Sequence, residues 1–208
     1  MIPEFTFHCC RNVEKVIMNN SVKRVENDAL FYCFSLEFVK LSTNLEYIGD
    51  GSLYGCKSLT SIFIPPSCRE IGCQAFIGCS ELIILSVPQD TQLGRRIIQR
   101  TALKRASSFP FDVDGYMSRQ RNNEVNAWIK NINRDSDAYS LHLLCCSDYP
   151  DDEQVYAFIS DNGLGVMTTP NEIGVSPSQY LGANPYVDFH QQTLINRYIL
   201  KKMCEIQP

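Results

Sequence analysis

Several common functional signatures are missing from this sequence. It has no apolar run of the roughly 18 residues that a membrane-spanning helix needs. Its opening residues, MIPEFTFHCC, lack the charged and apolar segments of a secretory signal. The formal net charge is −4, without a basic tail that would favour nucleic acid. There is also no nucleophile elbow, phosphate-binding loop or pair of catalytic carboxylates. We therefore expect a cytoplasmic protein that is not an enzyme, uses no cofactor and binds neither membranes nor nucleic acid.

Cysteine, in contrast, is abundant, with ten in 208 residues. An even number of cysteines in a small secreted chain would suggest a disulfide framework. Because the sequence carries no secretory signal, we expect reduced thiols instead. Four of the cysteines recur at a fixed distance, since Cys10, Cys33, Cys56 and Cys79 are each 23 residues apart. This spacing indicates an internal repeat.

Apolar residues follow the same 23-residue period. Three clear columns are Val16, Val39, Ile62 and Leu85; Met18, Leu41, Ile64 and Val87; and Ile2, Val25, Ile48 and Ile71. Each unit contains a short alternating segment, such as Ile62-Phe63-Ile64, whose first and third side chains lie on one face of a strand. A single short strand cannot shield its apolar face, but stacked units build a parallel sheet with a continuous interior. The sequence therefore predicts a solenoid.

The unit at residues 56–79 resembles the BspA-type leucine-rich repeat. That repeat reads Cys-x-x-Leu-x-x-Ile-x-Ile-Pro, then an Ile-Gly step and a closing Phe-x-Gly-Cys. The unit at 33–56 departs from it with Ser42 in the proline position, and a degenerate copy after Pro88 has Thr101 in the cysteine position. The resemblance implies an α/β repeat solenoid of about four coils over residues 1–106. It also implies a protein-protein interaction scaffold with an unknown protein partner.

The repeating cysteine position accepts Cys four times and Thr once. This substitution indicates a slot for a small side chain with a weak donor for backbone carbonyls, not a chemical role. The chain also begins in mid-repeat, because Ile2 and Phe7 already occupy repeat columns. We therefore expect a truncated sequence, a fragment, or a partner that pairs with or caps this end.

Past residue 106 the repeat register ends, and SSFPFDVDGYM reads as a connector. Apolar spacing predicts helices within residues 122–134, 151–163 and 191–205. Between the last two, NEIGVSPSQYL resembles the ankyrin turn, with Asn171, Gly174, Ser176 and Pro177 in matching places, and YSLHLLCC supplies a second copy 37 residues earlier. We therefore expect a helical, ankyrin-like region over 107–208. This combination resembles repeat proteins that are abundant in diatoms and other protists.

Three groups of residues carry possible chemistry. The strings HCC at 8–10 and HLLCC at 142–146 contain zinc ligands, but adjacent cysteines point in different directions and lack the usual Cys-x2-4-Cys spacing. His142 with Cys145 or Cys146 is the one near pair for a thiol nucleophile. A redox-responsive or metal-binding cysteine-rich protein is thus the alternative function. The third group is a basic cluster that either contacts phosphate or an acidic partner, or forms a solvated face on the last coil: Arg95, Arg96, Arg100, Lys104 and Arg105.

Strand alternation also predicts a partner-binding face. The side chains expected on the exposed side of the sheet are Lys15, Ile17, Phe38, Lys40, Ser61, Phe63, Ile84 and Ser86. Four of these eight are large and apolar, and a contiguous set of that kind is a candidate contact patch. The alternative is that the ankyrin-like half or a missing coil covers them.

Overall fold

The computed structural model describes residues 1–106, 119–132, 145, 152–171, 173–187 and 195–199. The chain divides into two compact units, Met1–Lys130 and Asn131–Pro208. The expected boundary between residues 106 and 107 marks the end of the 23-residue repeat. It stays a prediction, because residues 107–118 lie outside the described part.

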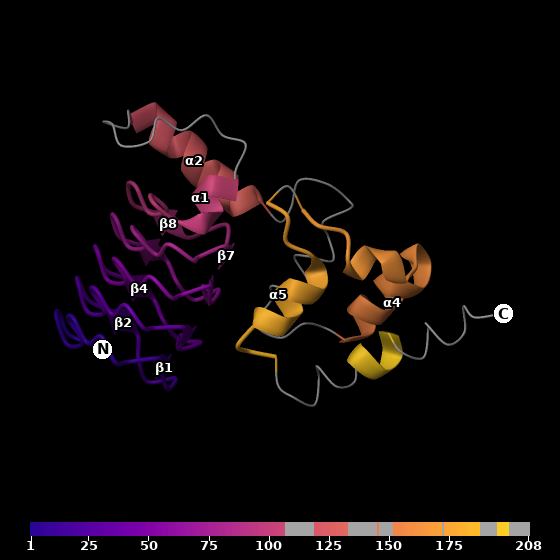
Figure 1. The fold of residues 1–208 in the computed structure, drawn as a ribbon, viewed down its shortest axis with the longest axis horizontal. Helices are drawn as coiled ribbons and strands as arrows, with labels where there is room; N and C mark the ends of the chain where they lie inside the picture. Colours follow the sequence, from indigo (N-terminus) through magenta and orange to yellow (C-terminus); the bar gives the residue numbers. More distant parts are fainter. Residues whose placement is uncertain (107–118, 133–144, 146–151, 172, 188–194, 200–208) are drawn as a thin grey trace. The chain divides into compact units, whose positions relative to one another are not determined.

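The first unit is a parallel solenoid in which two kinds of strand alternate along the chain (Figure 1). The three-residue strands are β1 (Lys15–Ile17), β3 (Phe38–Lys40), β5 (Ser61–Phe63) and β7 (Ile84–Ser86). The two-residue strands are β2 (Arg24–Val25), β4 (Tyr47–Ile48), β6 (Glu70–Ile71) and β8 (Gln92–Leu93). Val16 pairs with Val39, 23 residues on, whereas Glu70 pairs with Gln92, 22 residues on. Both the repeat period and its shortening in the last copy are confirmed.

The two kinds of strand build different sheets. The two-residue strands form one four-stranded sheet in the order β2-β4-β6-β8, while the three-residue strands form the pairs β1-β3 and β5-β7. Side chains from both kinds meet in a common interior, where Val39, Ile48, Ile62 and Ile71 are each no more than 3% exposed. Burial of these columns is the main stabilising contribution that one coil makes to the next.

The turn after each three-residue strand does not depend on proline. In the coil that contains Pro65, the N–H of Cys68 donates to the Pro65 carbonyl at 3.0 Å. In the coil that contains Ser42, the N–H of Leu45 donates to the Ser42 carbonyl at 3.1 Å, and the Ser42 hydroxyl also accepts the N–H of Asn44. The serine thus replaces the ring constraint of proline with a local side-chain hydrogen bond.

Helix α2 (Arg119–Asn131) covers the last coil within the first unit. As the sequence predicted, Val125 and Ile129 lie buried on one face. Three polar side chains, four residues apart, also hydrogen-bond the backbone of this coil: Asn122, Asn126 and Lys130. The Asn122 Oδ1 accepts the N–H of Arg96 at 3.0 Å, and the Lys130 Nζ donates to the carbonyl of Gln89 at 2.7 Å. Helix α2 therefore satisfies backbone groups that another coil would otherwise pair with.

The second unit contains α4 (Asp152–Asn162), the 3-10 helix η2 (Leu164–Met167) and α5 (Pro177–Ala183). Before α5, the Asn171 Oδ1 accepts the N–H groups of Ile173 and Val175. The Gln179 Oε1 then accepts the N–H of Ser176 at 2.8 Å, which fixes the start of the helix. The ankyrin-like assignment stays a prediction, because most of its other copy, YSLHLLCC, lies outside the described residues.

Helix is also present at residues 195–199, inside the third segment that the sequence predicted to be helical. Across the described ranges, every helix is too short or too polar to cross a bilayer.

Candidate binding surfaces

The repeating cysteines tie neighbouring coils together. Cys33, Cys56 and Cys79 are fully buried. Their thiols donate to the carbonyls of Phe7, Leu30 and Leu53, at 3.0, 3.3 and 3.2 Å respectively. Each acceptor lies 26 residues earlier and so belongs to the preceding coil. The thiols act as the weak backbone donors that the sequence predicted.

Burial keeps the thiol of Cys33 protonated and contributes to the same effect at Cys56. It raises the pKa of Cys33 to about 12, and a hydrogen bond with Cys79 together with burial raises the pKa of Cys56. Thiolates, not thiols, are nucleophiles and metal ligands. All the cysteines within the described ranges are free, and no cluster of three metal-binding side chains forms there. His142, which the nucleophile hypothesis and the second zinc string need, lies outside those ranges, as does Cys146.

Thr101 replaces the repeating cysteine in the last coil, just before a helix begins. It is fully buried, and its hydroxyl donates to the Ile98 carbonyl at 2.7 Å. The same hydroxyl accepts the N–H of Lys104 at 3.1 Å, at the start of helix α1 (Ala102–Ala106). Threonine suits this position better than cysteine, because its hydroxyl caps the first turn of the helix.

We expect replacement of Cys56 by alanine to lower the free energy of unfolding by about 1 kcal/mol, because it removes a small buried group and one weak hydrogen bond. Urea unfolding followed by the fluorescence of Trp128, the single tryptophan, measures this change in the first unit. Partner capture should be unaffected. Loss of partner capture with unchanged stability would show that the repeating cysteines have a binding role.

The predicted partner-binding face is only partly exposed. Strand pairing sets Lys15 beside Phe38, Ile17 beside Lys40, Ser61 beside Ile84, and Phe63 beside Ser86. Lys15 and Ile17 are exposed, whereas Phe38, Lys40, Ser61 and Ser86 are half-buried.

Phe63 and Ile84 are only 2% and 6% exposed, so the expectation of exposure was wrong for these two. The reason is that β5 and β7 bury apolar side chains on both faces, since Ile62 and Leu85 are buried as well. Continuous apolar runs are typical of strands buried on both sides.

A second surface, which the sequence analysis missed, lies in the segments that close the coils. We call Phe31, Tyr32, Phe34 and Tyr54 the aromatic surface. The ring centroids of Phe31 and Tyr54 are 5.0 Å apart and stacked, and those of Tyr32 and Phe34 are 5.2 Å apart. The Lys57 Nζ lies 4.6 Å from the centroid of Phe34, within range of a cation–π interaction. Aromatic faces and a cation are thus held together.

Beside these rings is a hollow of about 360 Å³, here called the aromatic pocket. It is lined by Tyr32, Phe34, Tyr54, Gly55, Lys57, Gly78, Ser80 and Arg100. Tyr32, Gly55, Gly78 and Arg100 occupy one position in successive coils, with φ of 56°, 73°, 74° and 60°. Because Gly55 and Gly78 occupy this position in two successive coils, no side chain of the column lies between Tyr32 and Arg100. The two glycines form the floor of the pocket. The sequence signal for it was this column.

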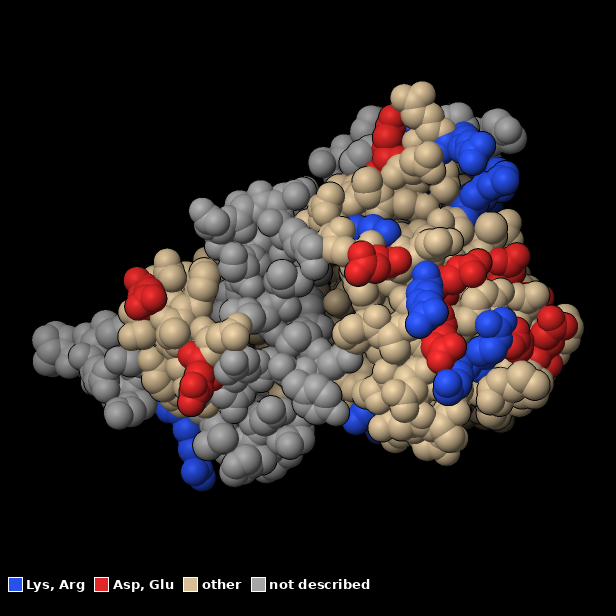
Figure 2. Space-filling model, turned by 180° about the vertical axis from the view of Figure 1, so that it is seen from behind, with Lys and Arg blue, Asp and Glu red and all other residues tan. Residues whose placement is uncertain are grey.

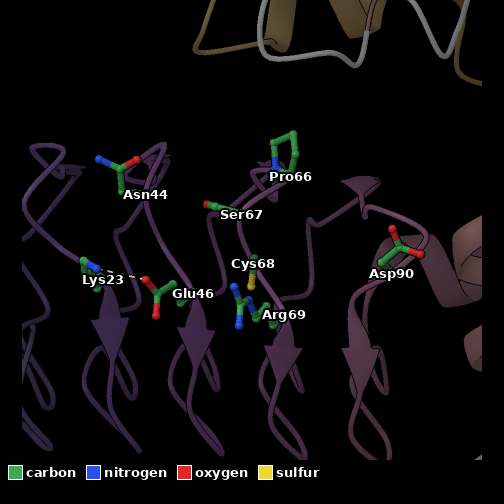
Figure 3. Close-up of a pocket in the computed structure, with 8 residues that line it drawn as sticks. All are labelled: Lys23, Asn44, Glu46, Pro66, Ser67, Cys68, Arg69 and Asp90. Carbon is green, nitrogen blue, oxygen red and sulfur yellow. Dashed lines mark hydrogen bonds and ion pairs between the residues drawn. The ribbon is translucent and has the colours of Figure 1, made fainter.

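A second hollow, of about 570 Å³, runs across the turns near β4 and β6 (Figure 3). Its charged side chains are Lys23, Glu46, Arg69 and Asp90. The Lys23 Nζ lies 3.1 Å from the Glu46 Oε1, and both side chains are largely exposed. Figure 2 shows the same mixture of acidic and basic side chains spread over the solenoid. Exposed pairs of this kind stabilise little, and the mixed charges favour no ligand of one sign.

Solved structures similar to this chain are leucine-rich repeat proteins. One, from Bacteroides ovatus, is 32% identical over 44% of this chain, with a TM-score of 0.42. A leucine-rich cell surface protein from Faecalibacterium prausnitzii is 28% identical over 42% of this chain, with a TM-score of 0.41. This chain covers only 24% and 23% of their lengths. A search of the curated proteins gives no match.

The family model for the BspA type leucine-rich repeat region matches residues 1–113 with six copies. The resemblance drawn from the cysteines, the Ile-Gly step and the closing Phe-x-Gly-Cys is therefore confirmed. The ankyrin-like second half and the protist source stay predictions. Because the match spans more than half of the sequence, the chain belongs to the BspA-type leucine-rich repeat family.

Proposed function

We propose that this protein is a non-enzymatic scaffold that binds another protein through the aromatic surface and its pocket. Repeat solenoids present extended surfaces for such contacts. The observation that carries the proposal is the grouping of four rings beside a hollow with a glycine floor. Tyrosine, phenylalanine and arginine are enriched at protein interfaces, and buried aromatic anchors dominate their binding energy.

The charges around this pocket indicate the chemistry of the partner. Lys57 and Arg100 line it together with neutral residues, and Arg11 lies 5.3 Å from the Phe34 ring centroid. None of the residues that line the pocket is acidic. A partner segment that inserts a ring or aliphatic side chain and carries a carboxylate nearby would match both features.

The exposed part of the predicted sheet face is a further proposed contact. Ile17 is 70% exposed, with Lys15 exposed and Phe38 and Lys40 half-buried beside it. These four residues keep the apolar and basic character that the sequence analysis assigned to the face. Ser61 and Ser86 continue it as small polar groups, whereas Phe63 and Ile84 contribute packing.

The cysteine-based alternative gains little from the structure. A redox-responsive or metal-binding protein needs accessible thiolates in a suitable group. Burial instead raises the pKa of Cys68 to about 11 and that of Cys145 to about 12. These two buried thiols are therefore better suited to packing than to redox exchange.

Filling the aromatic pocket should abolish partner binding. Gly78→Tyr places a ring on the pocket floor, and Tyr32 already adopts the same left-handed conformation in its own coil. A Cβ on Gly78 would meet nothing closer than the Gly55 Cα at 3.6 Å, so the fold should accept it. Capture with mass spectrometry from the native source identifies the partner. Titration calorimetry with the purified partner should then show an affinity at least about 30-fold lower, as loss of an interface anchor implies.

The matched control for this experiment is Gln74→Tyr. Gln74 has a φ of 61° and is exposed, but it does not line the pocket. Gln74→Tyr therefore introduces the same side chain in the same backbone conformation, but outside the aromatic pocket. If both variants kept full affinity, or lost it equally, the aromatic pocket would not be the binding site.

A further inference from the structure

A hollow of about 580 Å³ lies in the first unit between the last coil and helix α2. It is lined by Cys73, Leu93, Gly94, Arg95, Arg119, Asn122 and Asn123. We call it the arginine pocket. Its volume falls within the range of about 300–1,000 Å³ that is usual for small-molecule sites. It shares no lining residue with the aromatic pocket.

The two cations of this pocket come from different elements. Arg95 follows β8 directly after Gly94, and Arg119 is the first residue of α2. Within the described parts of the chain, neither guanidinium pairs with a carboxylate, and the residues that line the pocket include no acid. The hollow at Lys23, by comparison, balances its cations with Glu46 and Asp90. The arginine pocket therefore concentrates positive charge in a chain whose net charge is negative.

The same pocket holds a buried amide. Asn122 is 5% exposed, and its Oδ1 accepts the N–H of Arg96 at 3.0 Å. This bond fixes the orientation of the side chain and leaves the amide nitrogen as a donor. Asn126, one turn further along α2, donates to the carbonyls of Leu93 and Gly94 and holds the helix against the coil. Both walls of the pocket are thus positioned by hydrogen bonds.

We propose that the arginine pocket binds an oxyanion, a phosphate or carboxylate group carried by a small ligand. Guanidinium groups bind both groups with paired hydrogen bonds, and an amide N–H adds a neutral donor. The structure also divides the basic cluster of the sequence, because Arg95 lines this pocket and Arg100 lines the aromatic pocket. The oxyanion site stands independently of the proposed scaffold function.

Titration calorimetry on the full chain tests this site, with inorganic phosphate and succinate as separate probes in a chloride buffer. We expect saturable binding of one equivalent of at least one probe. Arg95→Gln and Arg119→Gln should each lower its affinity at least about tenfold, because each removes a charge-assisted hydrogen-bond pair. Arg119→Lys keeps the charge but not the paired donors. Its affinity for the probe should lie between those of the glutamine variants and that of the unmodified protein.

The matched control is Arg69→Gln, which makes the same charge change at the hollow where Glu46 and Asp90 balance the cations. It should leave the affinity unchanged, and circular dichroism checks that all variants fold. Binding of phosphate alone or of succinate alone would assign the group that the site prefers. Absence of saturable binding of both probes at millimolar concentration, or equal losses in Arg69→Gln and Arg95→Gln, would overturn the proposal.

Discussion

Phe63→Asp should lower the free energy of unfolding of the first unit by about 4 kcal/mol or more. Removal of a buried phenylalanine side chain costs about 3–5 kcal/mol, and the carboxylate would be placed where Phe63 is 2% exposed. Trp128 on α2 reports on this unit, so urea unfolding followed by its fluorescence measures the loss.

The control for Phe63 lies in its own column. Ile17 occupies the same position two coils earlier and is 70% exposed, so Ile17→Asp should change stability by less than about 0.5 kcal/mol. A large difference between the two variants identifies Phe63 as internal packing. Equally small effects would return Phe63 to the partner-binding face, and loss of partner capture would then be the expected result.

Gly72→Ala should cost about 3 kcal/mol or more, for a different reason. A Cβ on Gly72 would lie 2.5 Å from the backbone nitrogen of Asp50 and 2.7 Å from the carbonyl carbon of Gly49. Both atoms belong to the backbone of the preceding coil, which cannot move aside without separating β4 from β6. The glycine is therefore needed because the coils approach closely at this point.

Gly78→Ala distinguishes close approach from backbone conformation. Gly78 has a φ of 74°, but its added Cβ would meet only ordinary contacts. This variant should cost about 1 kcal/mol, the strain of a left-handed residue. Unfolding curves of both proteins, followed at Trp128, provide the comparison. If Gly78→Ala were as damaging as Gly72→Ala, coil spacing would not be the reason for the glycine at 72.

The parts of the fold that were predicted correctly are those that repeat. The cysteine and isoleucine columns predicted the period, the three-residue strands and the hydrogen-bonding role of Cys56. The two-residue strands were missed, because two residues such as Tyr47 and Ile48 carry no alternation. The polar contacts of α2 were also missed, since apolar spacing at Val125 and Ile129 predicts a buried face but says nothing of the carbonyl that Asn126 contacts.

The candidate sites were harder to predict than the fold. Alternation assigned Phe63 to the exposed side of the sheet, but alternation cannot show what covers a strand, and Phe63 is 2% exposed. The aromatic pocket depends on which residues align across coils. Gly55 and Gly78 indicate a hollow only when they are aligned with Tyr32 at the same repeat position. The arginine pocket joins Arg95 to Arg119 through the packing of α2, and no local pattern links two residues in that way.

The contacts of helix α2 also bear on how such a chain changes length during evolution. The side chains of Asn122, Asn126 and Lys130 hydrogen-bond to the last coil at four residues, Gln89, Leu93, Gly94 and Arg96. Duplication or deletion of one internal 23-residue segment would therefore leave every one of these bonds in place. Gain or loss of whole coils can thus change the length of the solenoid without changing the contacts between α2 and the last coil. Relatives that differ in length by multiples of one repeat should keep the Asn-x3-Asn-x3-Lys spacing of α2.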